Sequence, residues 1–567
     1  VVKAKGRLKV LSEMTDGGSA VPGSCGIGHT RWATHGEPND TNSHPHVSQN
    51  GKIAVVHNGI IENYLELREF LQQKGVKFAS QTDTEVVAQL MEYCMGLPEV
   101  ETVSDALYMV LHRIEGAYAL GILCSDDPDH VYAARKDAPL LIGFGEGENF
   151  IASDVTALVK HTRDIVYMED GEVAILGRDG VQVYNAMELP IEKEHHHIDW
   201  EISAAEKGGY EHFMLKEIME EPEALRRAIL PRIKDGTVGF DGLMLDSSRY
   251  DCIKIIACGS SYHVGMVGKY NLEKLTRMPV EVILASEFRY CSPIVNERTL
   301  AIIISQSGET LDTMAALREA KSLGARILSI VNVVGSSIAR ESDDVLYTWA
   351  GPEIAVATTK AYSTQMAVLD LLAVYLAAQR KTISAEEAGR LTAAIAALPA
   401  QVEQILSSRE QIQYYASQYF NHDSVFFIGR NLDYALGMEG SLKLKEISYI
   451  HSEAYASGEL KHGTISLIEP GTLVIALGTY GPLFDKAMSN VIEVKARGAS
   501  VLALTTENRR EDLSSRVDGI LTIPETELPL LPLLGVVPLQ LFAYYVALQR
   551  GCDIDKPRNL AKSVTVE

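Results

Sequence analysis

The chain has 567 residues, of which 46% are hydrophobic, and a formal net charge of −23. This length exceeds what a single hydrophobic core supports, so we expect two to four domains. The negative charge argues against binding to nucleic acid or to anionic membrane surfaces, but it allows a phosphorylated small substrate, because backbone N–H groups can bind an anion locally.

The first 190 residues contain short runs with strand patterning and two helical patterns, over 64–74 and 84–93. Short turns between successive runs predict antiparallel pairing. The predicted strands are 53–56, 118–123, 131–134, 140–144, 164–168, 172–176 and 181–184. The charged stretch 192–207 then indicates a solvated linker, and its three consecutive histidines do not form a convergent metal site.

The segment His29-Thr-Arg-Trp-Ala-Thr-His-Gly36 has no apolar periodicity, which is typical of a binding site rather than of a core. Asn58-Gly59 ends a predicted strand, and Asp83 stands just before a predicted helix. An arginine can clamp an α-carboxylate, an aspartate can hold an α-ammonium group, and an Asn amide with a Gly N–H can stabilise an oxyanion. These residues therefore predict a site for a zwitterionic amino-acid amide.

From about residue 254 the pattern changes to strand–loop–helix alternation, which predicts a parallel sheet with helices on both faces. The pattern also repeats, because strands near residues 253, 301 and 326 have counterparts near 425, 474 and 500, with offsets of 172, 173 and 174 residues. A nearly constant offset indicates two copies of one doubly wound domain. A helical stretch over 385–415 joins the copies.

Three loops of the first copy are rich in hydroxyl side chains: Cys258-Gly-Ser-Ser-Tyr262, Ser305-Gln-Ser-Gly-Glu-Thr310 and Val356-Ala-Thr-Thr-Lys360. Helix N-termini at the carboxyl edge of such a sheet bind phosphate. One such loop alone could be a plain helix N-cap, but three in one domain favour a sugar-phosphate site. The counterpart Gly478-Thr-Tyr-Gly481 has lost these hydroxyls, so we expect one phosphate site per chain.

Reactive side chains also occur near the C-terminus. Glu439, Lys443 and Glu446 share one face of a predicted helix, and from this spacing alone an exposed ion-pair ladder is the better interpretation. His462 lies in a predicted loop, and Lys562 lies in a tail that is unusually apolar for a free chain end.

The apolar run over 528–548 is long enough to span a bilayer. Prolines at 529, 532 and 538 interrupt it, so we expect a buried loop that leads into a core helix starting at Pro538, and no transmembrane helix. Seven cysteines without a CxxC motif, and no visible secretory or transit segment, predict a cytoplasmic location.

The motifs at 29–36, 58–59 and 81–85 resemble the glutaminase half of the class II amidotransferases. The repeated domains resemble a sugar-isomerase (SIS) pair, and the tail Arg558-Asn-Leu-Ala-Lys-Ser-Val-Thr-Val-Glu567 narrows the resemblance to the bacterial glutamine–fructose-6-phosphate aminotransferase (isomerizing) family, also called glucosamine-6-phosphate synthases. The resemblance implies an α+β sandwich of the N-terminal-nucleophile (Ntn) type, with antiparallel sheets between helices, followed by two α/β domains. The implied domains are 1–198 (glutaminase), 199–209 (linker), 210–384 and 385–556 (SIS) and 557–567 (active-site tail).

The resemblance also implies an activity. Fructose 6-phosphate and glutamine would be converted to glucosamine 6-phosphate and glutamate, with ammonia channelled between domains. No metal or other cofactor is implied, and the expected partners are the two substrates and a second copy of the chain, which shares the active site.

Individual residues receive roles by the same resemblance. The implied catalytic residues are Glu446 (isomerase base), Lys443 (its support), His462 (ring opening, contributed across the dimer), Lys562 (imine with the open ketose), and Asn58 with Gly59 (oxyanion). The implied glutamine-binding residues are Arg31, Thr34, His35, Gly36 and Asp83, with Trp32 as the channel gate. The implied sugar-phosphate residues are Ser260, Ser261, Ser305, Gln306, Ser307, Thr310, Val356, Thr358 and Ala561. A lysine side chain with the ordinary pKa of about 10.4 is mostly protonated at pH 7, so an imine-forming lysine needs help in losing a proton.

One part of the family pattern is missing from the sequence. The family begins with a cysteine whose thiol and free amine act on the amide, whereas this sequence begins at Val1, and Cys25 belongs to the strand that leads into His29. We expect the N-terminal segment to be absent from the sequence. The alternatives are an ammonia-dependent or plain sugar-phosphate isomerase without glutaminase activity, and a non-catalytic sugar-phosphate-binding SIS protein. A phosphoribosyl-pyrophosphate amidotransferase would share only the first domain.

Overall fold

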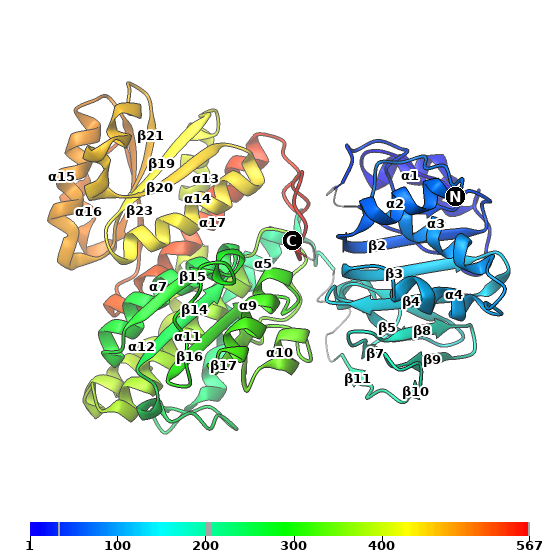
Figure 1. Cartoon of the computed structure of the whole chain (residues 1–567). Helices are drawn as coiled ribbons and strands as arrows, with labels where there is room; N and C mark the ends of the chain where they lie inside the picture. The colour runs from blue at the N-terminus through cyan, green and yellow to red at the C-terminus, as the bar shows by residue number, and fades with distance from the viewer. Residues whose placement is uncertain (32–34, 199–205, 565–567) are drawn as a thin grey trace. The chain divides into compact units, whose positions relative to one another are not determined.

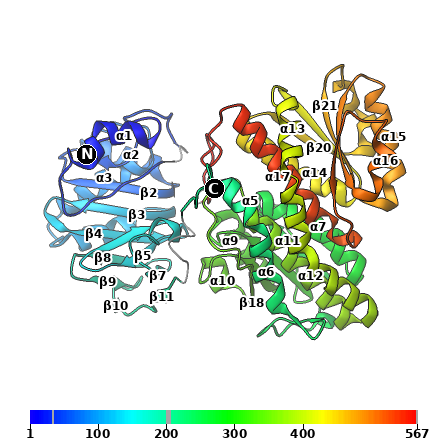
Figure 2. The same cartoon turned by 180° about the vertical axis from the view of Figure 1, so that it is seen from behind.

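The computed structural model describes residues 1–31, 35–198 and 206–564. The chain forms two compact units, Val1–Ile202 with Val564–Glu567, and Ser203–Ser563. Figures 1 and 2 show the elements of each unit from opposite sides.

The first unit is built from antiparallel strands and short helices. Its helices are α1 (Leu8–Met14), α2 (Tyr64–Gln73), α3 (Thr84–Met95) and α4 (Val103–Leu111). Its strands are β1 (His46–Val47), β2 (Ile53–Ile61), β3 (Gly116–Cys124), β4 (Asp127–Lys136), β5 (Leu141–Phe144), β6 (Asn149–Ala152), β7 (Asp164–Tyr167), β8 (Val173–Leu176), β9 (Val181–Tyr184), β10 (Pro190–Ile191) and β11 (His196–His197).

These strands form two antiparallel sheets, a seven-stranded one in the order β1-β2-β3-β4-β8-β9-β10 and a four-stranded one in the order β11-β7-β5-β6. One face of the larger sheet packs against α2, α3 and α4, where Val55 of β2 shares a core with Leu90 and Leu107. Its other face packs against the smaller sheet, where Ala133 and Ile142 are buried together. The predicted antiparallel sandwich is therefore confirmed.

The histidines at 195–197 do not lie in a free linker, as the charge pattern suggested. His196 and His197 form β11, which pairs with Ile165 and Asp164 of β7. The His197 Nδ1 atom lies 2.7 Å from Asp164 Oδ1. A two-residue strand is too short to show a period of two, so the sequence pattern could not reveal it.

The second unit contains two parallel sheets. The strands of the first are β14 (Cys252–Ala257), β15 (Val280–Leu284), β16 (Thr299–Ser305), β17 (Arg326–Val331) and β18 (Asp344–Tyr347). The strands of the second are β19 (Ser424–Gly429), β20 (His451–Ala456), β21 (Leu473–Gly478), β22 (Ser500–Thr506) and β23 (Gly519–Ile523). The remaining pair, β12 (Ile233–Lys234) and β13 (Thr237–Val238), forms a small hairpin.

The two parallel sheets have the same strand order, β15-β14-β16-β17-β18 and β20-β19-β21-β22-β23. The predicted duplication of a doubly wound domain is therefore confirmed. In each sheet the second strand is added on one side of the first strand and the third on the other side. The order of the strands therefore reverses between β14 and β16 and between β19 and β21. Such a switch point is where open α/β sheets bind ligands.

Helices cover both faces of each sheet. The helices of the second unit are α5 (Phe213–Met219), α6 (Glu221–Ile229), α7 (Gly259–Thr276), α8 (Ala285–Phe288), α9 (Leu311–Ser322), α10 (Ser337–Glu341), α11 (Lys360–Arg380), α12 (Ala385–Ser407), α13 (Arg409–Tyr419), α14 (Leu432–Ser448), α15 (Phe484–Lys495), α16 (Arg510–Leu513) and α17 (Leu531–Gln549). Helices α7, α11, α14 and α17 pack together in one large core that the two sheets share. This shared core holds the two SIS copies in one unit.

Two helical stretches, Lys360–Arg380 and Leu528–Gln549, are long and apolar enough to cross a membrane, but 89% and 100% of their most apolar windows are buried inside the unit. The expected helix start at Pro538 is wrong. Helix α17 begins at Leu531 with Pro532 in its first turn, and Pro538 lies inside the helix. A first-turn proline needs no N–H partner, so it starts a helix rather than breaking one.

Candidate functional site

Asn58 and Gly59, the predicted oxyanion residues, lie inside β2 rather than at its end, opposite Ala119 and Tyr118 of β3. Gly59 has a φ of +119°, and a Cβ atom there would overlap the carbonyl of Ala117. The position therefore requires glycine on two grounds, backbone conformation and space.

His29, to which the sequence analysis gave no role of its own, orients the Asn58 side chain. The backbone N–H of Arg31 donates to His29 Nδ1 at 2.8 Å, and His29 Nε2 lies 2.7 Å from Asn58 Oδ1. Burial lowers the pKa of His29 to about 4, so the ring is neutral at pH 7 and carries its proton on Nε2. Nε2–H then donates to the Asn58 carbonyl oxygen, which leaves the Asn58 NH₂ group to face a developing negative charge.

The other predicted glutamine-binding residues that the structure describes make contacts close to this pair. Arg31 Nη2 donates to the carbonyls of His35 at 2.6 Å and Gly36 at 2.9 Å. Asp83 is buried at the start of α3, and its Oδ2 accepts the N–H of Ile61 at 2.9 Å. The arginine, the aspartate and the amide thus belong to one region of the first unit. Trp32 and Thr34 lie outside the described residues.

Two of the three hydroxyl-rich loops, those after β14 and β16, lie at the switch point of the first sheet of the second unit. Ser305 ends β16, its Oγ accepts the N–H of Gly308 at 3.0 Å, and it lies 3.4 Å from Thr310 Oγ1. Ser307 Oγ accepts the N–H of Glu309 at 3.1 Å, and the half-buried Gln306 lies between these serines. Thr310 is the N-cap residue of α9.

Ser260 and Ser261 lie in the first turn of α7, after the neighbouring strand β14. The loops after β14 and β16 therefore meet at one edge of the sheet, as the sequence predicted. Ser261 Oγ donates to Gln365 Oε1 of α11 at 3.1 Å.

The carboxylates and lysine of α14 do not form an exposed ladder. The side chains of Glu439 and Lys443 are 0% and 1% exposed, and Lys443 Nζ lies 2.6 Å from Glu446 Oε2 and 3.4 Å from Glu439 Oε1. Burial alone would lower the pKa of Lys443, but the two carboxylates raise it above its ordinary value. Lys443 is therefore a permanent cation.

This buried group also connects the two copies of the SIS domain. Lys443 Nζ donates to Ser260 Oγ at 3.1 Å, and Ser260 Oγ lies 2.9 Å from Glu439 Oε1. His263 Nδ1, also on α7, lies 2.8 Å from Glu439 Oε2. Burial would raise the pKa of Glu439, but Lys443 and His263 lower it. The hydroxyl loop of the first copy thus meets the charged helix of the second.

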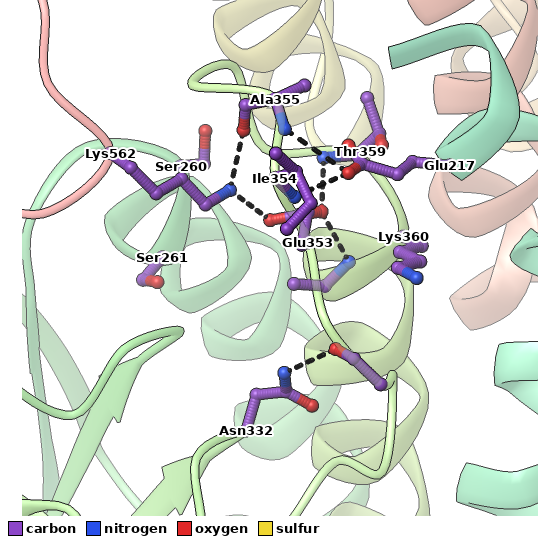
Figure 3. Close-up of polar contacts among 12 residues, drawn as sticks. Glu217, Ser260, Ser261, Asn332, Glu353, Ile354, Ala355, Thr359, Lys360 and Lys562 are labelled. Atoms are coloured by element: carbon purple, nitrogen blue, oxygen red, sulfur yellow. Dashed lines mark hydrogen bonds and ion pairs between the residues drawn. The ribbon is translucent and has the colours of Figure 1, made fainter. Parts of the chain in front are cut away.

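Lys562 points into the unit rather than out of it. Its Nζ donates to Glu353 Oε2 at 2.5 Å and to the Ala355 carbonyl at 2.8 Å (Figure 3). The contacted loop continues into Val356 and Thr358, both half-buried. The terminal lysine and the third hydroxyl loop therefore lie together.

Two predicted residues are not joined to this group. His462 is exposed at the end of the short helix Ser457–His462, and among the described residues no contact links it to the other predicted sugar-site residues. Ala561, next to Lys562, is exposed.

The chain matches known families over most of its length. The glutamine amidotransferase domain matches residues 29–160, and the SIS domain matches residues 249–375 and 418–550. A glutamine–fructose-6-phosphate aminotransferase (isomerizing) of Caldanaerobacter subterraneus is 56% identical, over 100% of this chain and 93% of that protein. One of Clostridium acetobutylicum is 53% identical over the same shares. The solved C-terminal domain of glucosamine-fructose-6-phosphate aminotransferase from Francisella tularensis covers 62% of this chain and 100% of its own, with 38% identity and a TM-score of 0.60.

Proposed function

The chain belongs to the glutamine–fructose-6-phosphate aminotransferase (isomerizing) family, and we propose that it converts fructose 6-phosphate and glutamine to glucosamine 6-phosphate and glutamate. The observation that carries this proposal is the hydrogen bond from Lys443 Nζ to Ser260 Oγ at 3.1 Å. It joins a loop suited to a phosphate ester with a helix that carries a carboxylate base.

In the glutaminase half, Arg31 binds the α-carboxylate of glutamine and Asp83 its α-ammonium group, while Thr34, His35 and Gly36 line the pocket. Asn58 and Gly59 donate to the oxyanion, and the neutral His29 holds the Asn58 amide in the donating orientation. The attacking thiol is assigned by the family resemblance to a cysteine that this sequence does not include. The family resemblance assigns to Trp32 the gate for ammonia on its way to the sugar half.

In the sugar half, the phosphate is held by the hydroxyls and N–H groups of the loops after β14 and β16, together with Val356, Thr358 and Ala561. His462 of the partner subunit opens the ring, and Lys562 forms an imine at C2. After ammonia has replaced the lysine, Glu446 moves a proton between C1 and C2, with Lys443 beside it as a fixed cation.

The architecture that we propose follows the predicted boundaries, with a glutaminase domain at 1–198, a linker at 199–209, SIS domains at 210–384 and 385–556, and a tail at 557–567. The active form that we propose is a homodimer in the cytoplasm. The dimer is needed because His462, which is exposed in its own chain, would act in the site of the neighbouring chain. Neither a metal nor another cofactor takes part.

The test is formation of glucosamine 6-phosphate with glutamine as the only nitrogen source, on protein whose first residue has been sequenced. Product formed from ammonium but not from glutamine would favour an ammonia-dependent enzyme. Binding of fructose 6-phosphate without turnover would favour a sugar-phosphate sensor and overturn the proposal.

A further inference from the structure

The Glu353 carboxylate, which the sequence did not single out, is the closest partner of the Lys562 amine. Its side chain is 0% exposed, and the Lys562 side chain is 19% exposed. Glu353 Oε1 accepts the N–H groups of Thr359 at 2.9 Å and Ala361 at 3.1 Å, and Oε2 accepts from Nζ at 2.5 Å (Figure 3). One oxygen is thus anchored at the start of α11, and the other is aimed at the amine.

We propose that Glu353 is a catalytic residue that carries the proton of Lys562 through imine formation. This inference rests on the proposed function, in which Lys562 attacks C2 of the open ketose. An ammonium group has no lone pair, so a base must remove a proton before the attack, and Glu353 is the base in contact with Nζ.

The proton returns within the same cycle. Nζ gives a proton to Glu353 Oε2, and the freed lone pair forms the N–C2 bond while the carbonyl electron pair moves to oxygen. A second proton passes from nitrogen to that oxygen and gives a neutral carbinolamine. Glu353 then donates its proton to the hydroxyl, which leaves as water while the nitrogen lone pair forms the iminium bond. The step ends with a carboxylate beside a cation, as it began.

The surroundings of Glu353 suit a group that alternates between two protonation states. Burial raises the pKa of Glu353, and the Lys562 ammonium lowers it below its ordinary value. When the nitrogen is neutral, the attraction of Lys562 disappears and burial favours the protonated carboxyl group. When the iminium forms, a positive charge returns to the same place and releases the proton.

Other ionisable groups face this carboxylate from the elements packed around it. They are Glu217 of α5, Glu221 of α6, and Lys360 of α11, which pairs with Glu220 at 2.7 Å. Burial and the charge of Glu353 raise the pKa of Glu217 to about 8, so Glu217 is mainly neutral at pH 7. Glu217 Oε1 accepts the N–H groups of Ile354 and Ala355, and so holds the loop without touching Nζ.

The experiment traps the imine in the full-length protein. Wild type and Glu353→Gln are mixed with fructose 6-phosphate, quenched with borohydride, and analysed for a reduced sugar on the Lys562 peptide. We expect trapping at pH 7 to slow by about 10²–10⁴-fold in the variant, the range of general acid–base catalysis. The variant rate should rise with pH, because a base from solvent must then remove the proton.

A matched control is Glu221→Gln, which removes another buried carboxyl group of the cluster without a contact to Nζ. Burial raises the pKa of Glu221 to about 8, so the neutral amide resembles its state at pH 7, and we expect wild-type trapping. Binding of fructose 6-phosphate is measured by calorimetry for each protein, and its retention in Glu353→Gln reports a folded site.

Three outcomes are distinguishable. Wild-type trapping by Glu353→Gln overturns the inference. Slow trapping that does not depend on pH, together with weakened sugar binding, assigns Glu353 a purely structural role and also overturns it. If wild type neither traps the sugar nor makes product, the proposed function fails, and the inference falls with it.

Discussion

Replacing Lys443 by methionine should destabilise the second unit in a pH-dependent way. Methionine keeps most of the side-chain volume but removes the cation that lies between Glu439 and Glu446. Removal of one partner from a buried ion pair costs about 3–5 kcal/mol, because the other charge stays buried without compensation. The penalty falls mainly on Glu439, whose side chain is 0% exposed, whereas that of Glu446 is 20% exposed.

The sign of the pH dependence follows from Glu439. In the wild type its folded pKa is lowered, so its contribution to stability is present above the ordinary value of about 4.3 and is lost only in acid. In the variant, burial raises the folded pKa above the unfolded value. Stability of the variant should then fall by about 1.4 kcal/mol per pH unit from pH about 4.3 up to the raised pKa. The deficit is therefore larger at pH 8 than at pH 5.5.

Scanning calorimetry at pH 5.5 and pH 8 measures this difference, since the two units need not unfold together. Lys445→Met on the same helix is the control, because Lys445 is exposed and should change stability little. Adding Glu439→Gln to the variant should restore much of the loss at pH 8. An equal deficit at both pH values, with no rescue by Glu439→Gln, would refute this account of the buried charges.

Three more substitutions test other parts of the structure. Gly308→Ala should abolish sugar-phosphate binding measured by calorimetry, because Gly308 has a φ of +68° and an added Cβ would overlap the Ser336 hydroxyl. Unchanged affinity would exclude the loop after β16 as the anion site. In protein that carries the N-terminal cysteine, His29→Ala should lower glutamate release by at most the roughly 10²–10³-fold seen when an oxyanion donor is lost, because the substitution frees the Asn58 amide to rotate but does not remove it. Glutamate release at the wild-type rate would contradict this role of His29. Glu221→Gln should become more stable relative to wild type as pH rises from about 4.3 to 8, because burial raises the pKa of Glu221 in the folded protein to about 8. A stability difference that calorimetry finds independent of pH would show that this carboxyl group is not desolvated.

The fold was predictable where a sequence pattern extends over a whole domain. The constant offset between the copies predicted two sheets of identical strand order, and the short apolar run 53–56 predicted part of β2. Helix α4 was missed, although Thr102 and Asp105 form a capping box at its start. That short motif is visible only when capping residues are sought explicitly.

The parts of the candidate site that are contiguous in sequence could be proposed from the sequence alone. A hydroxyl-rich loop between a strand and a helix can be recognised in the sequence, and the hydroxyl oxygens of Ser305 and Thr310 lie 3.4 Å apart. The contacts between charged residues could not be predicted in this way, because partners such as Lys562 and Glu353 are 209 positions apart in the sequence. Glu353 follows a Gly-Pro pair that suggests only a turn, so nothing local distinguishes it from a solvated glutamate. Such pairings follow from the packing of the fold.

The second SIS copy gives a physical reason to expect one anion site per chain rather than two. Asp433 is the second residue of α14, as Ser260 is the second residue of α7. Its Oδ2 accepts the N–H groups of Thr479 at 3.1 Å and Tyr480 at 3.0 Å, in the loop after β21, and the Thr479 hydroxyl donates to Oδ1.

A carboxylate of the chain itself therefore occupies the N–H groups that correspond, in the first copy, to those of the proposed phosphate-binding loop after β16. Burial raises the pKa of Asp433 to about 6, against the effect of these hydrogen bonds, so the group remains mainly an anion at pH 7. An arriving phosphate would have to displace a buried, hydrogen-bonded charge, which is unfavourable. The anion site of the second copy is thus occupied by its own carboxylate. The second copy contributes the charged face of α14 to the proposed sugar site, and the first copy contributes the hydroxyl-rich loops.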